Sequence, residues 1–127
     1  MSLEIMVGEK SPGIMNVALK GTLDANTYQT LEKRMELVYR TSPEVIIFDL
    51  EHLDYISSMG LRSISKARKI MKDNNGSLVL VNLQPQIQEV FDIIKALPAE
   101  QIFRNIEEMD KYLLARQKMN IAERKKP

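Results

Sequence analysis

The sequence predicts an α/β fold built as one domain. Short apolar runs that fit buried strands alternate along the chain with longer segments in which apolar residues recur at helical spacing. The 127 residues are 44% hydrophobic, which is enough to form one core, and the sequence contains no internal repeat. We therefore expect a mixed central β-sheet of about four or five strands, with about four helices that cover at least one face of the sheet.

The chain begins with two predicted strands, at residues 3–7 and 14–20. Residues 8–13 between them contain two glycines and a proline, which favour a turn, so the two strands should form a hairpin. A first helix is expected at about residues 25–40, ending before Pro43. Its inward stripe comprises Tyr28, Leu31, Met35 and Val38.

Residues 45–50 form a continuous apolar run that is typical of a strand buried on both faces. A second helix should follow, and Asn74 and Gly76 provide its stop signal. Its apolar positions are Leu61, Ile64, Ala67 and Met71. Residues 77–83 are predicted to form another buried strand.

A third helix is expected between Pro85 and Pro98, followed by a short final strand at Ile102 and Phe103. The last helix should begin near Glu107. The apolar residues expected to pack this helix against the rest of the domain are Met109, Leu113 and Leu114. The domain is thus predicted to span residues 1–115, whereas the polar and basic residues 116–127 should form a frayed, flexible extension or contact a partner.

Composition excludes several classes of function. The chain has 18 basic and 17 acidic residues, which argues against a general nucleic-acid binder. It has no cysteine, which excludes disulfides, thiolate zinc sites and cysteine nucleophiles and is compatible with a reducing cytoplasm. No basic leader precedes an apolar segment, and no apolar run approaches the ~20 residues of a spanning helix. We therefore expect a cytoplasmic protein with no direct nucleic-acid binding and no membrane insertion.

Two adjacent hydroxyls, Ser57 and Ser58, lie between the central strand and the second helix. One of the two should occupy the helix N-cap, where its oxygen accepts a bond from an unpaired backbone N–H group. The free amides and the positive dipole end at this position would stabilise a phosphoryl group, typically by ~0.3–1 kcal/mol for an exposed anion. Serine is also a common structural cap, so the local pattern leaves both roles open.

With these features the chain resembles the STAS domain family, and within it the anti-sigma factor antagonists of bacteria. The resemblance rests on the order and spacing of five segments that cover most of the chain. They are residues 21–24 (Gly-Thr-Leu-Asp), 45–50 (Val-Ile-Ile-Phe-Asp-Leu), 57–61 (Ser-Ser-Met-Gly-Leu), 76–81 (Gly-Ser-Leu-Val-Leu-Val) and 87–91 (Ile-Gln-Glu-Val-Phe).

The resemblance implies that Ser58 is the phosphoacceptor. Ser57 stands where many members have aspartate and remains a second candidate acceptor, while Met59 stands where Ser, Thr or Ala is common. Asp24 matches the family's Gly-x-Leu-Asp element near the phosphoacceptor, although alone it fits the N-cap of the first helix equally well. The implied partner-binding set is Asp24, Ser57, Met59, Gly60, Arg62, Lys66 and Lys69.

The last three residues of that set recur at helical intervals and could meet an acidic patch, although most charged runs are simply solvated. In the family, this surface meets the anti-sigma factor. The resemblance therefore implies a protein that, when unphosphorylated, binds an anti-sigma factor acting as its serine kinase and thereby frees a sigma factor. A metal-dependent serine phosphatase would reset it, and no cofactor is implied. The alternative is a STAS scaffold in a signalling complex or a transporter accessory subunit without a sigma switch.

Catalysis is not expected. His52 is the only histidine, and no glycine-rich phosphate loop with a following lysine is present. His52 lies near Asp49, Glu51 and Asp54, but one imidazole with scattered carboxylates in an expected solvent-facing loop falls below the usual set of metal ligands. Nucleotide binding at the helix start near Gly60 is a weaker third hypothesis.

Overall fold

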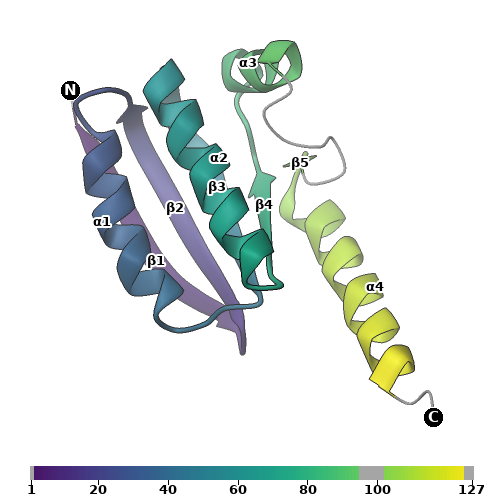
Figure 1. Ribbon diagram of the computed structural model, residues 1–127. Coiled ribbons are helices and arrows are strands. Elements are labelled where there is room, and N and C mark those ends of the chain that lie inside the picture. The colour runs from purple at the N-terminus through teal and green to yellow at the C-terminus, as the bar shows by residue number, and fades with distance from the viewer. Residues whose placement is uncertain (1, 95–101, 125–127) are drawn as a thin grey trace.

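The computed structural model describes residues 2–94 and 102–124, with side chains through residue 93 and from residue 102 to 115. These residues form five strands and four helices (Figure 1). In chain order they are β1 (Leu3–Ser11), β2 (Ile14–Leu23), α1 (Tyr28–Tyr39), β3 (Val45–Ile56), α2 (Ser58–Asp73), β4 (Ser77–Val81), α3 (Pro85–Ile94), β5 (Ile102–Phe103) and α4 (Ile106–Arg124). The predicted α/β class and the predicted numbers of strands and helices are confirmed.

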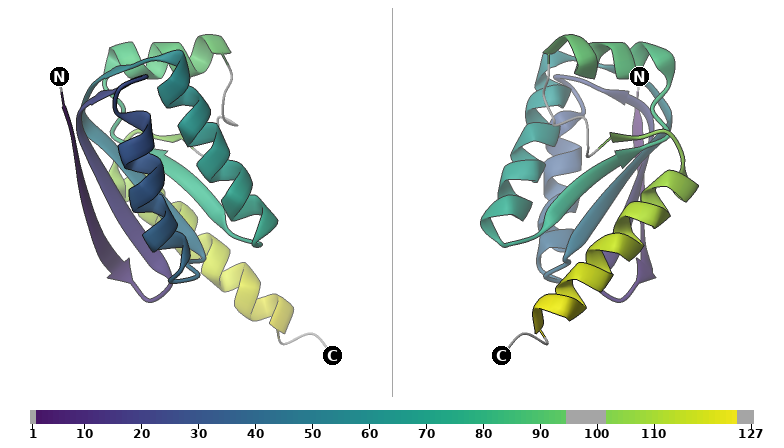
Figure 2. Two further views of the ribbon diagram at one scale, coloured as in Figure 1. Left: turned by 60° about the vertical axis from the view of Figure 1, so that its left-hand side comes forward. Right: turned by 90° about the vertical axis from the view of Figure 1, so that its right-hand side faces the viewer.

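The sheet has the strand order β1-β2-β3-β4-β5. β1 and β2 are antiparallel, as the predicted hairpin requires, and each later pair of neighbours is parallel. Helices α1 and α2 cover one face of the sheet, α4 lies on the opposite face, and α3 lies beyond one end of the sheet (Figure 2). The carboxyl ends of β2 and β3 therefore meet at the same edge, where α1 and α2 begin.

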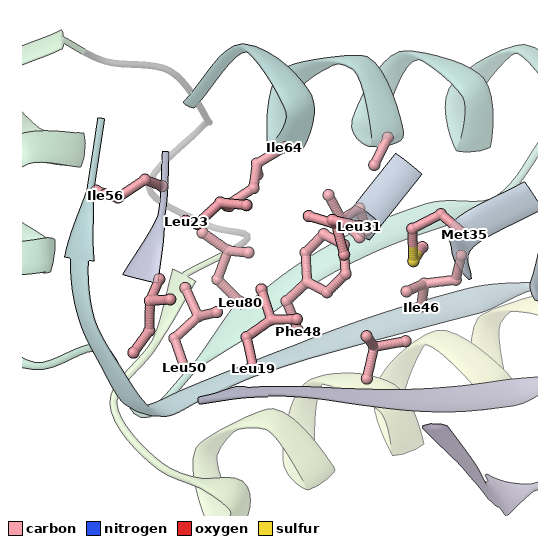
Figure 3. Packing of buried hydrophobic residues seen from close by; sticks show 14 of the residues in the cluster. Leu19, Leu23, Leu31, Met35, Ile46, Phe48, Leu50, Ile56, Ile64 and Leu80 are labelled. Atoms are coloured by element: carbon pink, nitrogen blue, oxygen red, sulfur yellow. The ribbon is translucent and has the colours of Figure 1, made fainter. Parts of the chain in front are cut away.

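A hydrophobic core lies on each face of the sheet. Alternation along β3 sends Ile46, Phe48 and Leu50 into the larger core beneath α1 and α2, and sends Val45 and Ile47 into the smaller core beneath α4 (Figure 3). Because the central strand is covered on both faces, its sequence is continuously apolar rather than alternating. Met109 and Leu113 of α4 belong to the smaller core, as predicted, but the prediction was wrong for Leu114, which lies on the outward side of the helix and is 54% exposed.

Two strands are longer than predicted. Residues 8–11, expected in the turn, continue β1, because Gly8 and Glu9 pair with β2 and the chain reverses at Gly13, whose φ is +81°. β3 continues from residue 50 to Ile56, because this mixed polar segment pairs with the end of β2 through two register shifts. The expected loop at Glu51 and His52 is therefore a strand, although both side chains are exposed as expected.

Other boundaries shift by a few residues. α1 begins at Tyr28 rather than at residue 25, because residues 24–27 form a turn. β4 ends at Val81, two residues early. The short β5 is confirmed. The backbone of α4 is helical through Arg124, so the extension predicted at residues 116–127 begins within a helix; its side chains lie outside the described residues, and its flexibility stays a prediction.

Candidate functional site

The start of α2 is attached directly to the end of β2. Leu23, the last residue of β2, pairs with Ile56 at the end of β3. The Leu23 carbonyl oxygen also accepts a hydrogen bond of 2.9 Å from the Ser57 N–H group. The turn that follows β2, beginning at Asp24, is thus held beside the first residues of α2.

Ser57 is the N-cap residue of α2, which confirms that one of the two serines caps this helix. Its backbone is extended, with φ −95° and ψ 176°, and its hydroxyl oxygen accepts a bond of 3.3 Å from the Gly60 N–H group. Its carbonyl accepts the first bond of the helix, from the Leu61 N–H group at 2.9 Å. The Ser57 side chain is half-buried, and its oxygen is already used by the helix.

Ser58 is the first residue within α2, and its side chain is exposed. The N–H groups of Ser58 and Met59 belong to the four at a helix start that have no acceptor inside the helix. The first turn contains no acidic residue. No carboxylate in the first turn of the helix therefore offsets the positive end of the α2 dipole. This positive end lies beside the solvent-exposed hydroxyl of Ser58.

Gly60 is buried where α2 begins, and no larger residue fits there. A Cβ atom at this position would lie 2.6 Å from the Leu23 carbonyl oxygen and 2.8 Å from Cγ1 of Ile56. We predicted Gly60 only as part of the partner surface. A glycine inside an otherwise helical pattern signals such a close approach, but the sequence does not show which atoms approach.

Asp24 does not cap α1. The N-cap is Thr27, whose side chain makes no capping hydrogen bond. The Asp24 carboxylate instead closes the turn before the helix, accepting from the Asn26 N–H group at 2.8 Å and from the Thr27 hydroxyl at 3.3 Å. The turn places the half-buried carboxylate of Asp24 next to Leu23, whose carbonyl accepts the bond from Ser57. The role of Asp24 in binding a partner stays a prediction.

The three basic residues predicted for the partner surface differ in their surroundings. Lys66 forms an ion pair with Glu32 of α1, at 3.5 Å, and Ser63 donates to the other oxygen of the same carboxylate at 3.2 Å. Arg62 and Lys69 are exposed and form no ion pair with any described residue. Arg62, one turn after Ser58, is therefore the cation on this helix best placed to meet a negative group near the hydroxyl.

The groove between α1 and α2 is lined by both apolar and polar side chains. Its polar lining residues include Glu32 and Tyr39. Burial, and to a lesser extent the negative charge of Glu32, raises the pKa of Tyr39 to about 12. The phenol therefore stays protonated at neutral pH and cannot act as a base there.

Oxygen atoms of the residues around His52 accept hydrogen bonds from the side-chain amides of Asn82 and Gln84. Asp49 accepts from the Asn82 side chain at 3.2 Å, and Gln84 donates to the Glu51 carbonyl at 2.8 Å. This network links the segment before α3 to the extended part of β3. Within the residues that the structure describes, no group of three or more His, Asp or Glu side chains could hold a metal ion. The amides of Asn82 and Gln84 belong to no sequence motif, and their part in this network was not predicted.

Replacing Ser57 with alanine is expected to lower the free energy of unfolding by about 1 kcal/mol, because the Gly60 N–H group loses its acceptor. Urea unfolding followed by circular dichroism measures this change. The matched control is Ser58→Ala, whose hydroxyl makes no capping bond and whose effect should stay within about 0.5 kcal/mol. Equal losses in the two variants would contradict the assignment of Ser57 as the cap.

A search against protein-family models finds the STAS domain over residues 6–109. Among curated proteins, the chain is 33% identical to BtrV of Bordetella bronchiseptica, named as an anti-sigma factor antagonist, over 67% of this chain and 73% of the relative. It is 28% identical to the anti-sigma F factor antagonist of Paenibacillus polymyxa, over 73% of this chain and 80% of the relative.

Solved structures share the fold at lower identity. The unphosphorylated anti-sigma factor antagonist SpoIIAA superposes with a TM-score of 0.74 at 16% identity, covering 88% of this chain and 97% of that one. A sulfate transporter family protein from Wolinella succinogenes gives a TM-score of 0.69 at 17% identity, covering 80% and 85%. No helix within the described residues is long and apolar enough to cross a membrane.

Proposed function

The chain belongs to the STAS domain family, and on that premise we propose that it is an anti-sigma factor antagonist controlled by phosphorylation of Ser58. The observation that carries the proposal is the exposed Ser58 hydroxyl at the start of α2, beside backbone N–H groups that lack an acceptor inside the helix. The names of the curated relatives support the same function. We further propose a cytoplasmic binding module without catalytic activity of its own.

Unphosphorylated, the surface around Ser58 binds an anti-sigma factor, and the sigma factor is released. The contact surface includes the turn at Asp24, the residue Met59, and the exposed cations Arg62 and Lys69, whereas the buried Gly60 acts only by letting the start of α2 pack closely against β2. Lys66 contributes less than the other cations, because its charge is already paired with Glu32. Complementary charge on the partner would chiefly speed association and fix its orientation.

Phosphorylation adds about −1.5 to −2 charges at neutral pH. The free domain tolerates this charge, because the unpaired N–H groups and the dipole of α2 stabilise an anion at Ser58. Inside a packed interface the same charge must be desolvated, so binding is lost. The kinase in this scheme is the anti-sigma factor itself, and a serine phosphatase restores the binding form.

Ser57 is the less suitable acceptor. Its hydroxyl oxygen accepts the Gly60 N–H bond and its side chain is half-buried, whereas Ser58 has neither constraint. Peptide mass spectrometry of the protein purified from its native cells, under several growth conditions, tests this choice. We expect phosphate on Ser58. Phosphate on Ser57 alone would reject the assigned acceptor, and no phosphate under any condition would reject the switch.

The second candidate is a STAS scaffold without a sigma switch, in a signalling complex or beside a transporter. The observation that favours it is Ser57, which stands where many members have aspartate. Affinity purification of the tagged full chain separates the two functions. A histidine-kinase-like partner supports the antagonist, whereas a membrane transporter or a sensor array as the main partner supports the scaffold.

A further inference from the structure

Strand β1 is the open edge of the sheet, and a groove runs between this edge and α1. β1 is outermost in the strand order, and α1 lies near it on the face of the sheet that α1 and α2 cover (Figure 2). Leu3 and Ile5 of β1 line one side of the groove. The other side is a stripe of α1 comprising Thr30, Lys33, Arg34 and Leu37. These four residues follow the i, i+3, i+4, i+7 spacing of one helix face, distinct from the face that enters the core.

The backbone of β1 offers hydrogen-bonding groups on this open side. The Ser2 carbonyl accepts from Thr22 of β2 at 3.1 Å. In an antiparallel ladder alternate residues bond to the same neighbour, so the even-numbered residues of β1 bond to β2. The N–H and C=O groups of Leu3, Ile5 and Val7 therefore point outward, and no other described strand pairs with that side.

The side chains along the groove combine exposed apolar surface with positive charge. Leu37 is 55% exposed despite being apolar. Lys33 and Arg34 are exposed and form no ion pair with any described residue. No carboxylate lines this groove, since Glu36 lines the groove on the other flank of α1 and Glu4 lies on the opposite face of β1.

We propose that this edge binds an extended acidic peptide segment of a partner protein, which adds as a strand beside β1. The main chain of the peptide would pair with Leu3, Ile5 and Val7. Alternate side chains would enter the groove, with apolar residues against Leu37 and carboxylates against Lys33 and Arg34. Strand addition at an exposed edge, with specificity from pockets for alternate side chains, is an established mode of peptide recognition.

The charges argue against a second copy of the chain as the occupant. Symmetric pairing of two β1 edges would place both α1 helices on the same face of the joined sheet, next to each other. Lys33 and Arg34 of one copy would then face the same cations of the other, and like charges brought together in an interface disfavour association. An acidic segment would instead bring carboxylates next to Lys33 and Arg34, so its charge attracts where that of a second copy repels.

Amide hydrogen exchange measured by NMR on the full ¹⁵N-labelled chain tests the proposal. The probe is an acetylated nonapeptide, Thr-Val-Thr-Glu-Thr-Val-Thr-Glu-Thr, at millimolar concentration, and the comparison peptide carries lysine in place of glutamate. We expect the acidic peptide to slow exchange at Leu3, Ile5 and Val7 while leaving Glu4 and Met6, already bonded to β2, unchanged. The basic peptide should produce no protection.

Charge reversal provides the second readout. The double variant Lys33→Glu with Arg34→Glu should weaken binding of the acidic peptide about tenfold, as expected when two exposed pairs become two repulsions. The matched control, Arg104→Glu with Lys111→Glu, makes the same change in net charge at exposed positions outside the groove and should leave the affinity unchanged.

Three results would overturn the proposal. They are no protection of the three odd-numbered amides, equal protection by the basic peptide, and protection that grows with protein concentration when no peptide is present, which would indicate a second copy. None of the residues in this test belongs to the proposed antagonist surface at the start of α2. Failure here would therefore leave the antagonist function intact, and failure of that function would leave this site intact.

Discussion

Replacing Ser58 with aspartate is expected to weaken binding of the anti-sigma partner about a hundredfold, or about 2.7 kcal/mol. The carboxylate places a negative charge at an exposed position that we expect the partner to cover, where the charge must be desolvated. Titration calorimetry with the partner recovered by affinity purification measures the change. Unchanged affinity would count heavily against a switch that acts through charge at this residue.

The matched control for this change is Ser58→Asn, which has the shape of aspartate without its charge. We expect it to retain most of the affinity. Stability should move in the opposite direction to affinity, because an aspartate in the first turn of α2 complements the helix dipole by about 0.3–1 kcal/mol. Weaker binding together with a raised unfolding midpoint would show that the interface, rather than the fold, responds to the charge.

Replacing Gly60 with alanine is expected to lower the free energy of unfolding by about 3 kcal/mol, near the upper end for overpacking a core. The added Cβ would lie 2.6 Å from the Leu23 carbonyl oxygen and 2.9 Å from Cγ of the same residue. Backbone at the end of β2 cannot yield without disturbing its pairing with β3. Urea unfolding followed by circular dichroism is suitable because the chain has no tryptophan.

The sign of this effect is diagnostic. Helix propensity alone predicts that alanine at Gly60 stabilises α2 by about 1 kcal/mol. The chain also provides a glycine control: a Cβ at Gly8, on the exposed part of β1, meets nothing within 4 Å. Gly8→Ala should therefore stay within about 0.5 kcal/mol of the natural chain. A Gly60→Ala variant as stable as the Gly8→Ala variant would mean that α2 does not approach β2 as closely as described.

The sequence predicted those parts of the fold whose signals are local. The apolar run at residues 45–50, the serines at the start of α2 and the stop at Asn74 each carry their meaning within a few neighbouring residues, and each was placed correctly. The resemblance to the STAS family added the order of the elements. It also drew attention to Asp24, which local patterns alone would have treated as an ordinary helix cap.

The features that the sequence did not predict depend on residues distant along the chain. The extension of β3 through Glu51 to Ile56 has no apolar run of its own and exists because β2 pairs with it. The partial neutralisation of Lys66 depends on Glu32, in another helix. Propensity and periodicity describe a segment and its nearest neighbours, so tertiary pairing of this kind lies beyond them.

The bond that the Ser57 N–H group donates to the Leu23 carbonyl, together with the close packing around Gly60, also bears on the kinetics of the proposed switch. Because the helix start is attached to the sheet at two neighbouring points, Ser57 and Gly60, we expect the free protein to hold it in one position and the binding-competent form to be the main form. The apparent affinity is then not reduced by a minor population of competent molecules. Addition or removal of one phosphoryl group, rather than a conformational equilibrium, would set how quickly the partner is captured or released.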